Sequence, residues 1–423
     1  MTKDKKQILL GKIASDKTSK KRGGSEMEYS TIGKGQEISA EGVIYDKGSV
    51  YGRLQTLTDT RKARGKRYSL ATLLMIVLLA KLGGADSPTA MAEWGNHHQS
   101  EVVAALRIKP KRMPERSTYQ RLMAYKVYET EIERMVGEYN QSDKRGDICA
   151  LDGKALLGML KREDGTSEYA LSVYDVQAGK TISQVGVGSK ENEITKAPEA
   201  IKLAKIAGKV VTGDALHTQK RLAQTILDEK GDYVFPVKEN QSNLYKNIQS
   251  LFAPEYPKPG FGKIQTDFLQ AQKVNKGHGR IEKRTLTTSE MLNTYAAWPG
   301  LAQVYRLERE FQWWRQGVCY KTSREVEFGI TSLSRKKVTP MKLLEVRRAH
   351  WGIETGSHYR RDLTLREDAT RFTIGNGARI MANINNLILA LIRQAGFLNA
   401  AQARRFFAAH LSLAFALLVT PFS

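Results

Sequence analysis

The stretch KVVTGDALHTQKRLAQTILDEKGDYVFPVK, residues 209–238, reads as a strand, a helix and a second strand. "KVVTGDA" and "DYVFPVK" are short apolar runs bounded by turn-forming residues, and the helical pattern between them runs from His217 to about Lys230. Alternation of this kind is typical of α/β proteins. Asp214 stands at the C-terminal end of the first strand, at the edge where α/β sheets build their sites.

Upstream of this unit, "DICALDG" (147–153) predicts a short, mostly buried strand. "EYALSVYDV" (168–176) and "KTISQVGVG" (180–188) alternate on either side of "QAGK" and predict a hairpin. A helix is expected from about Pro198 to Ile206. Asp152 ends the first strand, and we expect Gly153 to let the backbone turn away there and expose the carboxylate.

Downstream, residues 240–330 contain Gly-, Thr- and aromatic-rich runs that predict mostly strands. "FGITSL" (328–333) then reads as another strand, and helices fill the rest of the chain. This order resembles an RNase H-like sheet that is interrupted before its last helix. The predicted class is therefore α/β, an RNase H-like mixed sheet with flanking helices, a β-rich insertion and a preceding helical N-terminal domain.

The length of 423 residues suggests two to three units. We expect a basic flexible arm over 1–48, a helical domain over 49–142, a catalytic domain over 143–398 and an apolar helix over 399–423. Basic segments, "TDTRKARGKRY" (58–68) and "RIKPKRMPER" (107–116), lie between the helices of the second unit. This pattern is typical of a small DNA-binding domain, although a plain helical lid would share it.

The net charge of +23, from 67 Lys and Arg against 44 Asp and Glu, favours a polyanionic partner. Nucleic acid and an anionic membrane surface both fit, and solubility or one basic tail are the alternatives. "LATLLMIVLLA" (70–80) and the apolar C-terminal run (406–420) are too short to span a bilayer, so we interpret both as buried helices and expect no membrane. The two cysteines form no CxxC pair, which fits a reducing cytoplasm.

A third acid, Glu354, lies in "RAHWGIETGSHYRRDLTLREDATR" (348–371). On an α-helix, spacings of three, four and seven residues would place its cationic and aromatic neighbours on one face with it: Arg347, His350, Trp351, His358 and Arg361. Such a face suits a metal ligand beside a DNA backbone, where Arg forks to phosphate and Trp stacks on an unpaired base. The alternative is a salt-bridged surface helix.

Asp152, Asp214 and Glu354 together suggest phosphodiester chemistry. Cutting such a bond requires an activated hydroxyl and charge neutralisation on two oxygens, which two divalent ions about 3.5–4 Å apart supply. Carboxylates are the ligands that Mg²⁺ or Mn²⁺ prefers. The competing interpretation of each aspartate is the N-cap of the next helix.

The chain also resembles DDE insertion-sequence transposases of the H-repeat-associated group over residues 51–395. The resemblance rests on motifs that occur in the order of that group: "LTDTRKARGKRYSLATLLMIVLLAKLGGA", "LDGKALLG", "GSKENEITKAP", "GKVVTGDALHTQKRLAQTILDEKGDYVFPVKENQ", "GHGRIEKR", "ITSL" and "RRAHWGIETGSHYRRDLTLREDATR". It implies that Asp152, Asp214 and Glu354 are the metal-binding triad and that the β-rich part is the insertion before the Glu.

The same resemblance implies a transposase that cleaves and joins DNA at the terminal inverted repeats of its own element and in target DNA. Synapsis of two ends implies at least a dimer, associated with the nucleoid in the cytoplasm. An RNase H-like nuclease that does not join strands, and a transposase-derived DNA-binding repressor, remain alternatives.

Further candidate DNA contacts lie in two loops. "VKENQ" (237–241) supplies Lys238 and Asn240, and "GHGRIEKR" (277–284) supplies His278 and Arg280, with solvated loop charge as the competing explanation. The sequence departs from the group after Glu354, where it reads "TGSHYRR". Arg347, His350 and Arg361 occupy places where many relatives in the wider superfamily have Tyr, Arg and Lys.

Overall fold

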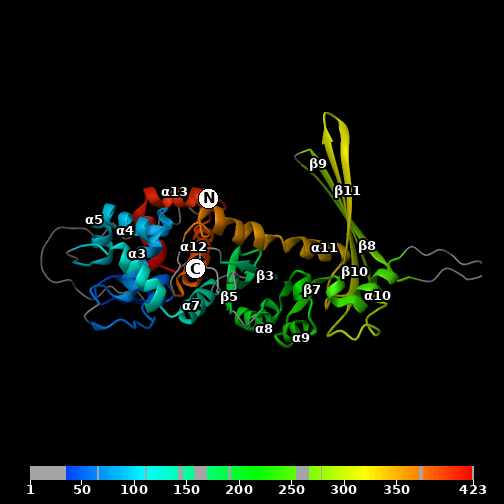
Figure 1. The fold of residues 1–423 in the computed structure, drawn as a ribbon, viewed down its shortest axis with the longest axis horizontal. Helices are drawn as coiled ribbons and strands as arrows, with labels where there is room; N and C mark the ends of the chain where they lie inside the picture. Colours follow the sequence, from blue (N-terminus) through cyan, green and yellow to red (C-terminus); the bar gives the residue numbers. More distant parts are fainter. Residues whose placement is uncertain are drawn as a thin grey trace, which may run out of the picture.

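The computed structural model describes residues 35–63, 66–109, 112–141, 146–156, 169–188, 192–253, 266–277, 279–370 and 375–421. The molecule is elongated, with a helical body at one end and a β-sheet with its own helices at the other. A long β-ribbon rises from the sheet, and a helical segment that begins at α11 runs from the sheet to the helical body (Figure 1).

One mixed sheet contains nine strands in the order β5-β4-β3-β6-β7-β11-β10-β9-β8 among the described residues. Its first five strands are β3 (Ile148–Ala155), β4 (Tyr169–Asp175), β5 (Lys180–Val187), β6 (Val210–Thr212) and β7 (Asp232–Val237). β3, β4 and β5 form an antiparallel meander, while β6 and β7 run parallel to β3. This arrangement is RNase H-like, and it confirms the predicted fold class.

The β-rich insertion continues this sheet and is not a separate lobe. Its four strands are β8 (Leu269–Gly277), β9 (Arg280–Ser289), β10 (Gln303–Arg315) and β11 (Val318–Thr331), which follow the helix α10 (Ser242–Leu251). The last residues of β11 pair antiparallel with β7, Phe328 opposite Val237 and Thr331 opposite Val234. The strand expected after the insertion is therefore the inner half of β11, whose outer half belongs to the ribbon.

Helices cover both faces of the sheet. On one face α8 (Glu193–Ala204), α9 (Lys220–Asp228) and α10 pack on apolar side chains of β3 to β7, including Leu151, Val211 and Phe235. On the other face Leu343, Leu344 and Val346 of α11 (Pro340–Ala349) pack on β7, β9 and β10. The sheet that contains β3 and β6 is therefore packed between two layers of helices.

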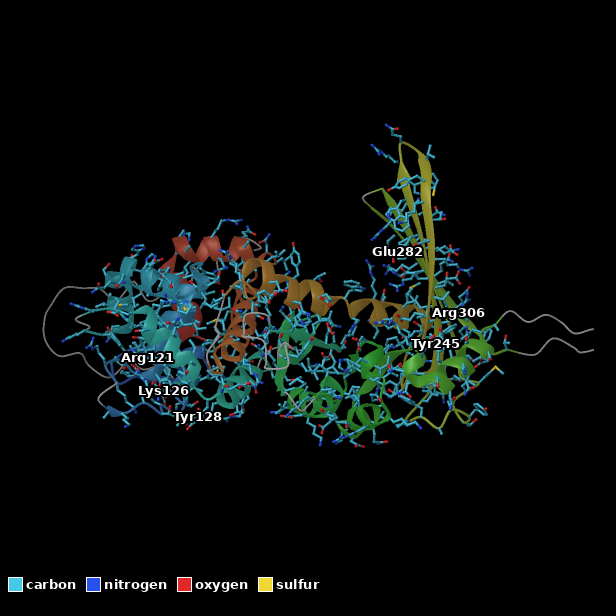
Figure 2. The ribbon with its side chains drawn as sticks, viewed as in Figure 1. Arg121, Lys126, Tyr128, Tyr245, Glu282 and Arg306 are labelled. Carbon is cyan, nitrogen blue, oxygen red and sulfur yellow. The ribbon has the colours of Figure 1, made fainter. Side chains whose placement is uncertain are left out.

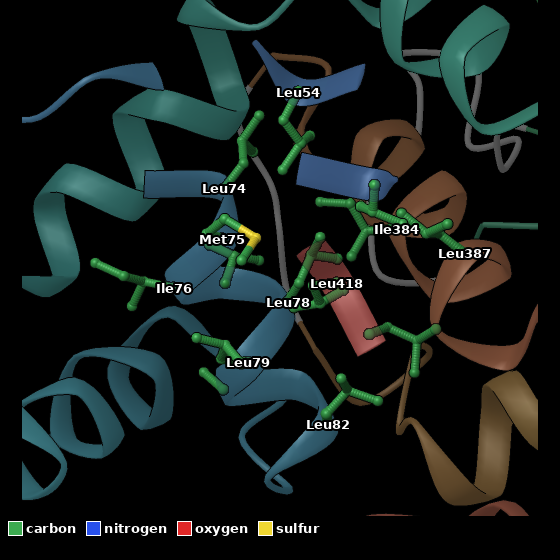
Figure 3. Close-up of a cluster of buried hydrophobic side chains, with 14 of the residues drawn as sticks. Leu54, Leu74, Met75, Ile76, Leu78, Leu79, Leu82, Ile384, Leu387 and Leu418 are labelled. Atoms are coloured by element: carbon green, nitrogen blue, oxygen red, sulfur yellow. The ribbon is translucent and has the colours of Figure 1, made fainter. Parts of the chain in front are cut away.

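The helical body combines segments from both ends of the chain (Figure 3). Its N-terminal part consists of α2 (Val50–Leu54), α3 (Leu70–Leu82), α4 (Pro88–His97), α5 (Gln99–Leu106), α6 (Arg116–Arg121), the π-helix η2 (Leu122–Lys126) and α7 (Glu129–Gln141). α12 (Gly377–Gln394), α13 (Ala400–Ala409) and α14 (Leu411–Val419) enter the same core, where Ile384, Leu387 and Leu418 lie close to Leu78.

Three segments differ in detail from the sequence expectation. Residues 399–423, expected as one apolar helix, contain two, α13 and α14, separated at His410. α12, which falls in the range expected for the catalytic domain, packs in the helical body. Residues 36–46 of the expected arm form two paired strands, β1 (Gln36–Ile38) and β2 (Ile44–Asp46), while residues 1–34 lie outside the described part. The domain boundaries themselves remain a prediction.

The apolar run at 70–80 forms α3, whose residues are all buried. Ser69 caps its first turn by accepting a hydrogen bond from the Thr72 N–H. At its last turn the buried Lys81 Nζ lies 3.0 Å from Asp86, which also pairs with Arg404 of α13 at 2.9 Å. Among the described residues, every helix is too short or too polar to meet the requirements of a membrane span.

Asp86 thus compensates two buried cations that tie α3 to α13. We expect Asp86→Ala to lower the free energy of unfolding by about 3–5 kcal/mol, because both charges would stay buried without a counterion. Urea unfolding measures this change. Glu199→Ala, which removes the exposed partner of Lys196, is the control and should cost less than about 1 kcal/mol; equal effects would contradict the assignment.

Candidate active site

Asp152 lies in β3, with its side chain 18% exposed. Its Oδ1 accepts a hydrogen bond of 2.9 Å from the Gly153 N–H. β3 continues to Ala155, so the backbone does not turn away after Asp152 as the sequence had suggested. Gly153 serves a different need, because a Cβ at this position would lie 2.4 Å from the carboxylate of Glu193. The glycine makes room for a second acid beside Asp152.

Asp214 follows β6, the strand that pairs with β3 in parallel. Ala150 of β3 lies opposite Thr212 of β6, so both strands deliver their acids to the same end of the sheet, two residues further along. Asp214 also caps the short helix η3 (Ala215–His217) by accepting a hydrogen bond of 3.3 Å from the His217 N–H. The N-cap interpretation therefore applies to this residue, and its role in a site stays a prediction.

Glu354 begins a π-helix, η5 (Glu354–His358), and a second one, η6 (Arg360–Thr364), follows it. Their i→i+5 hydrogen bonds include Tyr359 N–H to the Glu354 carbonyl. Wider turns break the 3.6-residue periodicity, so the six side chains predicted to share one face do not share it. Glu354 stays half exposed, whereas His358 and Arg361 face the interior.

The helix approaches β4 closely. A Cβ at Gly356 would lie 2.1 Å from the hydroxyl of Tyr174, and Ile353 packs with Tyr174 and Ala150 in a small buried cluster. Ala150 is two residues before Asp152 on β3. These contacts bring Glu354 over the end of the strand that carries Asp152.

Oxygens of Asp152 and Glu354 and a ring nitrogen of His358 all lie within 4.8 Å of one another. His358 Nδ1 is 3.6 Å from Asp152 Oδ2 and 3.6 Å from Glu354 Oε2. Burial, and then the cations Arg361 and Lys154, lower the pKa of His358 to about 3. The imidazole is therefore neutral near pH 7, and its contacts with the two acids are polar rather than ionic.

The charges of this cluster repel. Burial, and then the negative charge of Glu354, raise the pKa of Asp152 to about 7 against the opposing hydrogen bond from Gly153. Asp214 and Glu193 contribute further to this rise. Such a concentration of carboxylates suits a site that receives cations.

A second acidic group, Asp362, Glu367 and Asp368, lies further along the same segment. Here two buried cations neutralise the acids. Lys154 Nζ is 2.7 Å from Asp362 and 3.5 Å from Asp368, and Arg361 forms a two-pronged pair with Glu367 at 2.6 and 2.8 Å. This group is an ion-pair network that joins β3 to η6.

Comparison with known proteins identifies the family of this chain. A profile of the family described as "Transposase DDE domain" matches residues 161–391, and one described as "DDE_Tnp_1-associated" matches residues 51–139. The chain belongs to the DDE transposase family. The first match includes Asp214 and Glu354 and begins after Asp152.

Among curated proteins, the putative transposase YncI of Escherichia coli O157:H7 is 27% identical over 82% of this chain and 87% of its own length. The H repeat-associated putative transposase YhhI of Escherichia coli (strain K12) is 25% identical over 80% and 89%. A solved structure, the piggyBac transposase synaptic complex with hairpin DNA, matches with a TM-score of 0.42 and 12% identity, covering 88% of this chain and 78% of that one. The H-repeat-associated resemblance of the sequence is confirmed.

In this DDE-family chain, several side chains that were expected to contact DNA pair with residues of the protein itself. Arg347 donates to Glu327 at 2.6 and 3.0 Å and is largely buried, and Arg361 is 0% exposed. His350 is largely buried and pairs with the Thr212 hydroxyl at 3.2 Å. Each of the three side chains therefore has a partner within the protein in this structure, and its contact with phosphate stays a prediction. Trp351, at 63% exposure, points to solvent.

The loop candidates have different surroundings. Lys238 and Asn240 are exposed and line a hollow of about 650 Å³ together with Ala215, the neighbour of Asp214. Asn240 also donates to the Ala215 carbonyl at 2.7 Å, which anchors that loop. Arg280 lies at the tip of the ribbon, with its guanidinium over the ring of Phe311. His278 lies outside the described residues.

The sequence did not indicate that three further residues lie close to Asp152 and its neighbours in space. Glu193 looks like an ordinary residue of a helix N-terminus, and Lys154 like an ordinary residue at the end of a strand. His358 was expected to contact DNA rather than the acids. The only available signal was that "LDGK" and "KENE" each place charge where a buried element begins or ends.

The close approach of Gly356 to Tyr174 predicts the effect of a single methyl group. We expect Gly356→Ala to lower the free energy of unfolding by at least about 1–3 kcal/mol, because a Cβ would overpack the buried tyrosine. Urea unfolding tests it. Gly277→Ala is the control, since a Cβ there meets nothing within 4 Å, and similar losses in both variants would contradict the close contact.

Proposed function

We propose that this protein is a metal-dependent DNA transposase that cleaves and joins strands at the ends of its own insertion sequence. The observation that carries the proposal is the convergence of Asp152 and Glu354 within 4.8 Å, with Asp214 at the same end of the adjacent parallel strand, in a chain of the DDE transposase family. The full triad rests on this geometry, since the family match begins after Asp152.

The donor set fits a hard divalent cation. Asp152 and Glu354 supply carboxylate oxygens, which suit Mg²⁺ or Mn²⁺, and Asp214 offers a third carboxylate that is 52% exposed. Two such ions would activate the attacking hydroxyl and neutralise charge on the leaving oxygen. Burial, and then the negative charge of Glu354, raise the pKa of Asp152 to about 7, and a bound cation would offset that charge.

Around the acids, the chain's own residues would position DNA. Trp351 lies exposed three residues before Glu354 and could stack on an unpaired base, while Lys238 is exposed near the Asp214 loop. On the helical body, the exposed Arg121, Tyr125, Lys126 and Tyr128 alternate cationic and aromatic side chains. Figure 2 shows Arg121, Lys126 and Tyr128 on this body. Arg280 at the ribbon tip remains a candidate contact.

The proposed DNA partners are the terminal inverted repeats and a target duplex. Two ends must be held together for joining, so the acting form is proposed to be at least a dimer. Incubation of the protein with a fragment carrying both ends, Mg²⁺ and a target plasmid tests the function. Joined products support a transposase, cleavage without joining supports a nuclease, and end binding without cleavage supports a repressor.

Triad variants should separate chemistry from binding. We expect Asp152→Asn, Asp214→Asn and Glu354→Gln each to reduce cleavage by more than the roughly 10–100-fold that loss of an outer partner of a metal site costs. Binding to end DNA, measured by gel shift, should stay nearly unchanged because phosphate contacts remain. Asp368→Asn is the control, since Asp362 also pairs with Lys154. Near-normal cleavage by any triad variant would remove that residue from the site.

Affinity for DNA should fall steeply with salt. Each neutralised phosphate contributes a slope of about −0.9 in log–log terms, so 6–10 contacts would cost about 10³–10⁵ in affinity between 50 and 200 mM. Fluorescence anisotropy with a labelled duplex over this range measures the slope. A nearly flat dependence would mean that the charge of +23 does not serve DNA binding.

A further inference from the structure

A fourth acid stands at the end of β3. Glu193 is the first residue of α8, and its carboxylate lies 2.4 Å from the position that a Cβ on Gly153 would occupy. Gly153 directly follows Asp152, so the carboxylates of Glu193 and Asp152 are neighbours, and the negative charge of Glu193 contributes to the raised pKa of Asp152. The side chain of Glu193 is only 20% exposed.

The capping of α8 does not account for Glu193. Asn192 already accepts from the Thr195 N–H, and Thr195 reciprocates to the Asn192 N–H, which completes a capping box. A carboxylate in the first turn gains a few tenths of a kcal/mol to about 1 kcal/mol from the helix dipole at the surface. That gain does not require a position against Gly153, where another carboxylate repels it.

The carboxylate of Glu193 lies beside the ring of His217. The His217 ring is 0% exposed, and neither of its nitrogens has a hydrogen-bond partner among the described residues. Its Nε2 lies 3.6 Å from Glu193 and 3.9 Å from Asp214, so this buried imidazole is directed between the two acids. Its backbone N–H also donates a hydrogen bond of 3.3 Å to Asp214 Oδ1.

We propose that Glu193 is a fourth carboxylate of the active site, and that His217 is the positioning residue that holds Glu193 and Asp214 together. The inference rests on the proposed function and adds a residue to its cation-binding group. Asp152 and Glu354 lie beside His358, and Glu193 and Asp214 lie 3.6 and 3.9 Å from His217 Nε2. Gly153 lies between Asp152 and Glu193 because no larger residue leaves room for both.

The test is Mn²⁺ binding by the full-length protein. Isothermal titration calorimetry and the electron paramagnetic resonance signal of free Mn²⁺ both measure this binding. Five proteins are compared: the parent, Glu193→Gln, His217→Gln, Asp152→Asn and Glu199→Gln. Glu199 is the matched control, since it lies on the same helix, is exposed and pairs with Lys196. Thermal unfolding in EDTA is measured for each protein.

We expect Glu193→Gln to weaken Mn²⁺ binding at least tenfold and to raise by a similar factor the Mg²⁺ concentration that gives half-maximal cleavage. His217→Gln should weaken binding less, because it leaves all four carboxylates in place. Without metal, Glu193→Gln should unfold at the same temperature as the parent or higher, since one repelling charge is lost. Glu199→Gln should match the parent in every measurement.

Three results would overturn the inference. Mn²⁺ affinity of Glu193→Gln within twofold of the parent, with a large loss in Asp152→Asn, would exclude Glu193 and leave the proposed function intact. A lower unfolding temperature in EDTA together with unchanged Mn²⁺ affinity would assign Glu193 to the structure of α8. Unchanged affinity in both Glu193→Gln and Asp152→Asn would overturn the metal site of the proposed function along with this inference.

Discussion

Like-charge repulsion between Asp152 and Glu354 is the constraint that the surrounding structure has to overcome. The two carboxylates lie far apart in the chain, and neither gains by approaching the other unless a cation is present. Packing supplies the force that brings them together. Ile353 is buried against Ala150 and Tyr174, and Gly356 lets the helix backbone reach β4. Apolar burial on each side of the acids thus holds them at a distance that electrostatics alone would increase.

Buried ion pairs fix the position of the Glu354 helix on the sheet. Lys154 lies two residues beyond Asp152 on β3 and pairs with Asp362, while Arg361 pairs with Glu367 and also contacts Gln184 of β5. Removing such charges from water offsets much of their attraction, so these pairs add little net stability. Their geometry is demanding, however, and a helix displaced along the sheet would leave several charges buried without partners. The pairs therefore select one position of the Glu354 helix rather than strengthen the fold.

The strands and the acids could be predicted from the sequence, but the π-helical turns around Glu354 could not. Asp152 and Asp214 follow apolar runs whose pattern is local, so the strands could be predicted, although β3 runs three residues beyond Asp152. The helical spacing around Glu354 could not, because π-turns arise where the packing of Gly356 on Tyr174 overrides the usual i→i+4 bonds. Glu193 has the composition of an ordinary helix start, and only the three-dimensional contact with Gly153 distinguishes it. The continuity of β11 from ribbon into sheet was likewise hidden, since no turn signal marks the change.

The same polar network reaches the helical body, which limits how independent the two halves can be. Asn385 of α12 donates to Glu367 at 2.7 Å, and Asn386 donates to Gln184 at 2.8 Å, so α12 borders the layer that positions Glu354. α12 is held in turn by the apolar core that α3, α13 and α14 share. A buried network of this kind is costly when any member loses its partner. α12 therefore links the apolar core of the helical body to the polar network beside the candidate active site.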